Sequence, residues 1–222
     1  MVPNAGFWNR SLRGVVFLAW RSIWQANIVV FISSACTLIL ELVAGRVLAP
    51  YVGVSLHTWT SIIGVVLAGI AIGNYLGGRI ADRRASPTTL AAILFASSLT
   101  TIGVLATTAV FAGYGVLSQL PLMARIVGLT FLIFFVPTLL MGMVSPVVIK
   151  LTLANLRTTG NTVGTIYAFS TAGSIVGTFL TGFLLVELMG VRAIVISVGV
   201  VLLLMAVVSS RLWRSADSRV GT

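Results

Sequence analysis

The sequence predicts an all-α membrane protein, a bundle of six transmembrane helices built as two inverted three-helix repeats. Three observations predict this fold class. The 222-residue chain is 58% hydrophobic and only 8% charged, whereas soluble domains carry about 25% charged residues. The apolar residues form six long runs with short connections. Glycine-rich stretches in the second and fifth runs follow the same pattern, which indicates the internal repeat.

Each apolar run reaches or approaches the ~20 residues that a helix needs to cross the hydrocarbon core. The runs are too long and too uniformly apolar for barrel strands. Proline marks several limits: Pro50 ends the first run, and Pro137 and Pro146 predict breaks in the fourth, because each removes a backbone donor. The spans are expected at residues 23–48, 58–80, 88–112, 122–149, 162–188 and 191–209.

The two ends of the chain are basic. Residues 1–22 hold Arg10, Arg13 and Arg21 among aromatic side chains. Two readings stay open, a short interfacial helix on the cytoplasmic leaflet or a disordered basic tail. The expected organisation is therefore a basic segment at 1–22, a six-span domain at 23–210 and a cytoplasmic basic tail at 211–222.

The placement of the basic residues predicts orientation. With the N-terminus inside, 11 of the 14 lysines and arginines fall in cytoplasmic segments, and Arg46, Arg125 and Arg192 remain outside. This asymmetry predicts a multi-pass protein of the cell (inner) membrane with both termini cytoplasmic. The net charge of +10 does not indicate nucleic-acid binding, because the charges separate apolar runs and form no polar patch.

The repeat is visible where residues 69–78 read GIAIGNYLGG and residues 173–182 read GSIVGTFLTG. The alternative is a chance likeness between two glycine-rich membrane helices. Five of these glycines are expected to pack helices closely, since small residues let membrane helices approach: Gly69, Gly73, Gly77, Gly173 and Gly177.

Glu41 lies inside the first apolar run. A carboxylate there costs several kcal/mol unless it is paired, hydrated or protonated, so it is a functional candidate by default. Arg46 is about 140° away around the same helix, which disfavours an ideal pair, and is expected near His57 at the outer interface. Two roles stay open: a substrate or proton site made by these three residues, or a protonated Glu41 that ties two helices.

Asp82, Arg83 and Arg84 close the second span. One interpretation is a conformational lock, in which Asp82 meets a neighbouring helix end or a base such as Arg157. The other is a solvated loop charge. A helix N-terminus or a cytoplasmic arginine is the expected partner.

Catalytic patterns are missing from the sequence. It contains one cysteine and one histidine, too few for a metal cluster of ordinary spacing. No phosphate-binding glycine loop and no nucleophile elbow occur. We therefore expect no cofactor and no metal, and an enzymatic role is the least favoured.

Two stretches carry a family resemblance. Residues 41–83 (ELVAGRVLAPYVGVSLHTWTSIIGVVLAGIAIGNYLGGRIADR) and residues 164–190 (GTIYAFSTAGSIVGTFLTGFLLVELMG) resemble the membrane portion of fused major-facilitator/spermidine-synthase-like proteins. GRIADRR at 78–84 is also similar to the cytoplasmic loop motif of the major facilitator superfamily, although the glycine that usually follows the basic pair is missing. The resemblance implies a half-facilitator of six spans. Since no aminopropyltransferase-like domain follows in this sequence, transferase activity is expected to belong to another chain or to a part not included in this sequence.

The function expected first is a membrane transport or binding module for a small metabolite, with polyamine-like cations as candidates. It would act in the lipid bilayer as a homo-oligomer or with a spermidine-synthase-like partner. The alternative is a non-transporting anchor or scaffold subunit of a larger complex. A polar cavity that reaches Glu41 would favour the first, and a fully packed bundle with a large partner surface the second.

Overall fold

The computed structural model describes residues 5–114, 117, 119–153 and 159–217, and these residues form helices and short turns with no strand. Six helical segments among them are long and apolar enough to cross a membrane, which confirms the predicted six-helix transmembrane bundle. The elements in chain order are α1 (Ala5–Val52), α2 (Leu56–Arg84), α3 (Pro87–Thr108), η1 (Ala109–Gly113), α4 (Leu122–Gly142), α5 (Val144–Thr152), α6 (Thr159–Leu180), η3 (Thr181–Leu185), α7 (Val186–Leu188) and α8 (Val191–Asp217).

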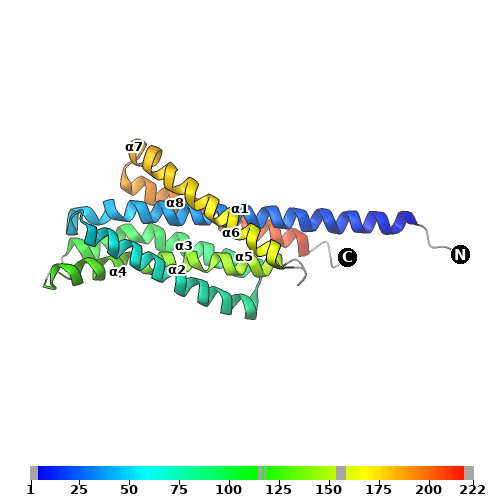
Figure 1. Ribbon diagram of the computed structural model, residues 1–222, viewed down its shortest axis with the longest axis horizontal. Helices are drawn as coiled ribbons and strands as arrows, with labels where there is room; N and C mark the ends of the chain where they lie inside the picture. The colour runs from blue at the N-terminus through cyan, green and yellow to red at the C-terminus, as the bar shows by residue number, and fades with distance from the viewer. Residues whose placement is uncertain (1–4, 115–116, 118, 154–158, 218–222) are drawn as a thin grey trace.

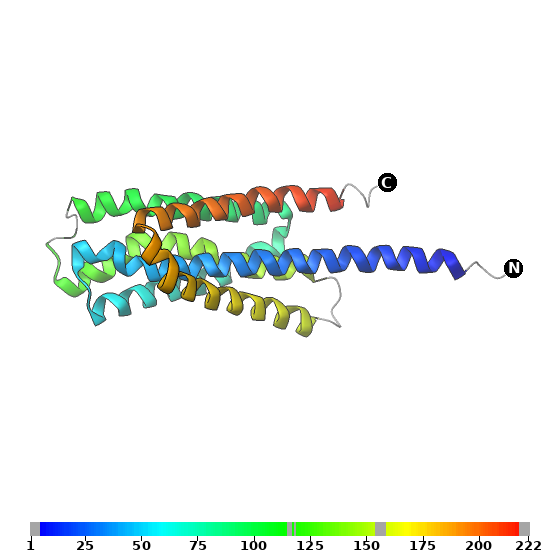
Figure 2. The same ribbon diagram turned by 90° about the horizontal axis from the view of Figure 1, so that it is seen from above.

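The helix of the first span is longer than the span. α1 begins at Ala5 and continues through the expected boundary at residues 22 and 23 without a break. No glycine or proline lies between Gly14 and Gly45, so nothing in that stretch interrupts the helix. Figures 1 and 2 show the N-terminal part of α1 projecting beyond the bundle. At the other end of the chain, the helix of the sixth span likewise continues to Asp217.

The fourth span is broken at only one of its two prolines. The break expected at Pro137 is absent, because α4 continues through Pro137 to Gly142, and one missing backbone donor did not end the helix there. α4 ends at Gly142, a single residue, Met143, lies between the helices, and α5 begins at Val144. Pro146 has no amide proton to donate to the carbonyl of Gly142, so the helical ladder is interrupted there. The fifth span also changes its winding, because the π-helical η3 separates α6 from α7.

The six spans lie in three layers of two. Figures 1 and 2 show α2 and α6 in one layer, α1 and α4–α5 in the middle, and α3 and α8 in the third. The closest helix pairs are α2 with α4, α1 with α6, and α3 with α8. Both chain termini and the α2–α3 turn lie at one end of the bundle, which we call the terminal end (Figure 1). The α1–α2 and α7–α8 turns lie at the other, the hairpin end.

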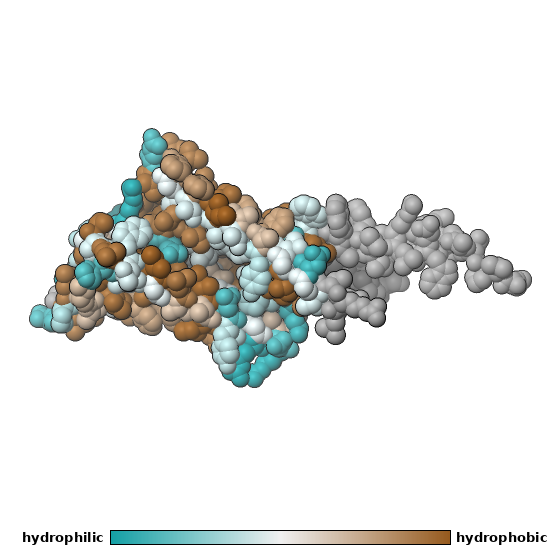
Figure 3. Space-filling view, viewed as in Figure 1, coloured by the Kyte–Doolittle hydropathy of each residue, from teal (hydrophilic) through white to brown (hydrophobic). Residues whose placement is uncertain are grey.

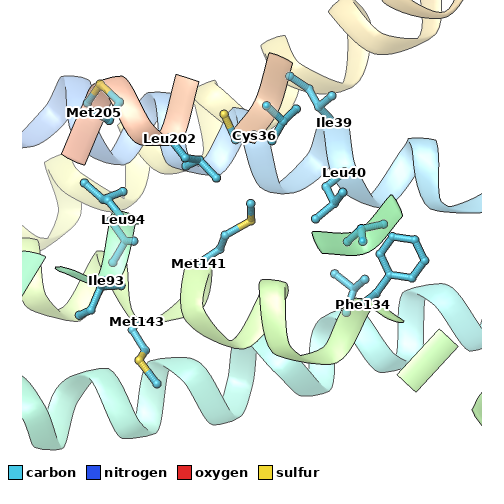
Figure 4. Packing of buried hydrophobic residues seen from close by; sticks show 14 of the residues in the cluster. Cys36, Ile39, Leu40, Ile93, Leu94, Phe134, Met141, Met143, Leu202 and Met205 are labelled. Atoms are coloured by element: carbon cyan, nitrogen blue, oxygen red, sulfur yellow. The ribbon is translucent and has the colours of Figure 1, made fainter. Parts of the chain in front are cut away.

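The middle of the bundle is apolar outside as well as inside. Figure 4 shows buried aliphatic and sulfur-containing side chains between the helices, with Met141 of α4 pointing toward α1. On the outer face, apolar surface lies between more polar ends, and the C-terminal end of α2 forms a polar patch (Figure 3). In α6, many large apolar side chains remain exposed, including Ile175, Val176 and Phe179. A bilayer would cover such a surface, since lipid tails are as apolar as these side chains.

Candidate functional site

The predicted glycine face of α2 packs against α4 and the start of α5. A methyl group on Gly69 would meet the side chain of Thr138 and lie 3.2 Å from the carbonyl oxygen of Phe135. On Gly73 it would collide with the carbonyl oxygen of Leu139. These glycines are needed because the two backbones touch, which is how small residues work in membrane helices.

A second crossing of the same kind joins α6 to α1. A methyl group on Gly173 would collide with the carbonyl oxygen of Phe31, and one on Gly177 would lie 2.6 Å from that of Ala35. The hydroxyl of Ser34 in α1 and that of Ser170 in α6 are 2.7 Å apart and share a hydrogen bond.

The two crossings correspond residue by residue. Gly173 follows Gly69 by 104 residues, and Phe135 follows Phe31 by the same 104 residues. The relation also holds for the second contact, in which Gly177 follows Gly73 and Leu139 follows Ala35 by 104 residues. In each crossing a glycine meets the carbonyl of the counterpart residue in the other half. This second part of the pattern is invisible in the sequence, because residues 31–35 and 135–139 are not glycine-rich.

A cavity of about 240 Å³ lies between these four helices. Hydroxyl and amide groups supply most of its polar surface, and none of its lining residues is charged. The lining residues are Ser34, Thr37 and Leu38 from α1, Ile70 and Asn74 from α2, Met141 and Gly142 from α4, Ser145 from α5, and Tyr167, Ser170 and Ser174 from α6.

The floor of the cavity is formed where α1 meets α4. The hydroxyl of Thr37 lies 3.4 Å from the sulfur of Met141, within hydrogen-bond distance, and Met141 follows Thr37 by 104 residues. Two residues related by the offset are therefore in direct contact. If a twofold axis related the two halves, a residue could touch its own counterpart only close to that axis.

The lining set includes this contact and extends from it toward the terminal end of the bundle. Six lining residues form three pairs under the 104-residue offset: Thr37 with Met141, Leu38 with Gly142, and Ile70 with Ser174. The other five are Ser34, Asn74, Ser145, Tyr167 and Ser170, and they lie toward the terminal end of their helices. Their counterparts, Thr138, Thr178, Glu41, Ile63 and Val66, do not line the cavity.

Glu41 lies one helical turn from the cavity. It follows Ser34, Thr37 and Leu38 at spacings of seven, four and three residues, which places it on the same face of α1. Its side chain is half-buried and makes no hydrogen bond or ion pair with the residues that the structure describes. Arg46 and His57 are exposed. The structure therefore does not join these three residues into one site.

The charged end of α2 has a different partner from the one expected. Nζ of Lys150, at the end of α5, donates a hydrogen bond of 2.9 Å to a carboxylate oxygen of Asp82. The expected partner was an arginine or a helix N-terminus. Within the described part of the chain, Arg83 and Arg84 are exposed and their side chains make no ion pair. Arg157 lies outside the described residues.

Sequence reasoning missed the hydroxyl residues of the cavity. A signal was present, because Ser170 and Ser174 are four residues apart in an apolar helix and Ser34 and Thr37 are three apart, so each pair shares a helix face. It also missed the roles of Ser55 and Ser86, which cap the N-termini of α2 and α3 by accepting hydrogen bonds from the amides of Thr58 and Thr89.

The chain matches no protein-family model, no curated protein and no solved structure with which it was compared. The likeness to spermidine-synthase-like fusion proteins thus rests on the motifs in residues 41–84 and 164–190.

Proposed function

We propose that this chain is a membrane transport or binding module for a small polar metabolite. The observation that carries the proposal is the hydroxyl-lined cavity between α1, α2, α4–α5 and α6. A bundle that served only as an anchor would need no cavity lined by polar side chains from four helices. The hydroxyls of Ser34, Thr37 and Ser170 have hydrogen-bond partners inside the protein, which lowers the cost of placing them in a membrane interior.

The lining chemistry limits the ligand. Serine and threonine hydroxyls and an asparagine amide both donate and accept hydrogen bonds, so they suit hydroxyl, amide or amine groups. The volume of about 240 Å³ equals that of about eight water molecules. These features favour a molecule of a few heavy atoms.

The 104-residue correspondence supports the inverted repeat that we propose for this chain. α2 and α6 hold equivalent places and run in opposite directions, and their glycines meet counterpart carbonyls. In transporters built from inverted repeats, the substrate site lies near the bilayer midplane between the repeats. The cavity contains the contact between Thr37 and Met141, which supports such a location for the site.

The remaining parts of the proposal rest on the sequence. The basic-residue asymmetry favours a cytoplasmic terminal end, so the cavity in this conformation extends toward the cytoplasm. The motif GRIADRR at residues 78–84 supports a relationship to facilitator-type membrane domains, and such a half-size bundle would work as a homo-oligomer or with a spermidine-synthase-like partner.

The test is uptake of radiolabelled putrescine, and of glycerol as a neutral probe, into proteoliposomes that hold the full chain. Ser174→Leu fills the cavity from α6, and Thr171→Leu adds the same side chain at an exposed position of the same helix. We expect saturable uptake of at least one probe, reduced at least tenfold by Ser174→Leu and unchanged by Thr171→Leu. Equal uptake by both variants would reject the cavity as the site.

A second candidate, a non-transporting anchor or scaffold subunit, is favoured by one observation. Gly160, Gly164, Ala168 and Ala172 lie at four-residue intervals and are exposed on α6, and a methyl group on Gly160 or Gly164 would meet nothing within 4 Å. Such a stripe suits a close helix contact with another chain. Gly164→Leu separates the candidates: loss of an assembly on size-exclusion chromatography with uptake intact supports a docking role for this face.

A further inference from the structure

We propose that the site has a second half on the hairpin side of the axis, where Glu41 is the ligand-binding acid for a small organic cation. This inference rests on the proposed function. It adds the substrate class and a second conformation in which the cavity opens toward the hairpin end.

The first step is the asymmetry of the cavity. The five lining residues whose counterparts do not line the cavity all lie on the terminal side, and their counterparts lie on the hairpin side. Exchanging the conformations of the two halves would bring those counterparts into the lining. The matching glycine contacts at both crossings are what such an exchange of packing between the halves would require.

The second step is the chemistry of the residues that would line the cavity after this exchange. In the second lining, Thr138 would occupy the place that Ser34 has here, and Thr178 the place of Asn74. These two positions of the lining therefore remain polar. Val66 and Ile63 would occupy the places of Ser170 and Tyr167, so the lining on the hairpin side is more apolar. Glu41 would occupy the place of Ser145, and it is the sole charged residue of the second lining.

The present structure closes the hairpin side by packing. Val66 and Thr138 have no exposed surface, and Thr138 is pressed against Gly69. Thr178 is half-buried on the stripe of α6 that also carries Ser170 and Ser174. Opening this side requires the α2–α4 contact at Gly69 to loosen, whereas α1 and α6 are already in contact at Ser34 and Ser170.

The third step is the unpaired carboxylate. Glu41 is half-buried in a membrane span and makes no hydrogen bond or ion pair with the described residues. The cavity next to it contributes hydroxyls and no base. A lone carboxylate in the hydrocarbon region is unfavourable, so a cationic amine that enters the second half of the site would supply the missing charge.

The experiment uses the full chain in proteoliposomes with Cys36→Ala, which removes the single native cysteine. Asn74→Cys reports on the terminal side and Thr178→Cys on the hairpin side. A membrane-impermeant thiol reagent is added from one side or the other, with and without putrescine. We expect Asn74→Cys to react from the terminal side, Thr178→Cys to react from the hairpin side, and putrescine to slow the second reaction at least fivefold.

The Glu41→Gln variant, combined with Thr178→Cys, identifies the ligand-binding acid. We expect the thiol to stay reactive and putrescine protection to disappear, while Glu187→Gln, at an exposed acid in α7, leaves protection intact. Glu41→Asp is the second variant, and it should retain part of the protection if a carboxylate is what matters. Full protection in Glu41→Gln would overturn the role of Glu41.

Failure of this inference differs from failure of the proposed function. A reactive Asn74→Cys with an inert Thr178→Cys would overturn the second half-site and leave the terminal-side cavity standing. An inert Asn74→Cys would reject the water-accessible cavity itself, and the inference with it. A reactive Thr178→Cys that putrescine does not protect would overturn the organic-cation assignment, with a proton as the remaining counter-charge for Glu41.

Discussion

Two adjacent glycines of α2 offer a sharp test of the packing argument. Gly77 faces the junction between α4 and α5, whereas a methyl group on Gly78 would meet nothing within 4 Å. Alanine at each position adds one methyl group to the same helix turn. The two variants therefore differ in the direction of the new group and in little else.

The magnitude follows from the contact distances. An ideal Cβ on Gly77 would lie 2.7 Å from Cα of Met143 and 2.9 Å from Cγ of Pro146, and ordinary contact begins at 3.4 Å. The helices must separate by about 0.7 Å, which forfeits roughly a quarter to a half of the local van der Waals attraction. Overpacking of this kind costs about 1–3 kcal/mol. Gly78→Ala should be neutral or stabilising, since alanine favours helix over glycine by up to about 1 kcal/mol.

The assay is thermal unfolding of the purified variants in one detergent, followed by tryptophan fluorescence. For a chain of this length the expected loss corresponds to a Tm lowered by roughly 2–12 °C in Gly77→Ala. Gly78→Ala should unfold at or above the Tm of the parent protein. If both variants kept the parent Tm, or if Gly78→Ala lost as much as Gly77→Ala, close backbone contact would not be what these glycines provide.

Three further outcomes follow from the contacts. A double-mutant cycle with Asp82→Asn and Lys150→Met, measured by unfolding, should give a coupling free energy of at most about 1 kcal/mol that decreases in high salt, because the pair is exposed. A coupling free energy above about 2 kcal/mol that does not change with salt would contradict this. Ser34→Ala and Ser170→Ala should each lower the free energy of unfolding by about 0.5–1.5 kcal/mol. The double variant should lose less than the sum of the two, because both substitutions remove the same hydrogen bond, and strict additivity would argue against that shared bond. Cysteines at Val54 and Asp82 should react with an impermeant reagent from opposite sides of the membrane, and labelling of both from one side would refute the number of crossings.

The candidate site was only partly predictable from the sequence. Glu41 lies within a candidate span, as the sequence predicted, because the position of a residue within an apolar run is a local property. Its role in a site stays a prediction. Its surroundings were not predictable, because Arg46 and His57 are exposed and neither forms an ion pair with Glu41 among the described residues. Asp82 was expected to have a partner, yet the lysine that pairs with it lies 68 residues away, and no local rule selects Lys150 over an arginine.

The sequence by itself determined the six spans and the glycine faces of the second and fifth, because hydropathy, helix length and four-residue spacing are local quantities. It also signalled the break in the fourth span through Pro146. The tertiary structure alone decided that the Gly73 face meets α4 and the Gly177 face meets α1, and that hydroxyls from four helices enclose one cavity. These facts depend on which helix surfaces fit together across more than one hundred residues of chain. Two helix faces with nearly the same small residues give no indication in the sequence of which helix each one packs against. The 104-residue correspondence between Gly69–Phe135 and Gly173–Phe31 became visible only when the carbonyls that face the glycines were known.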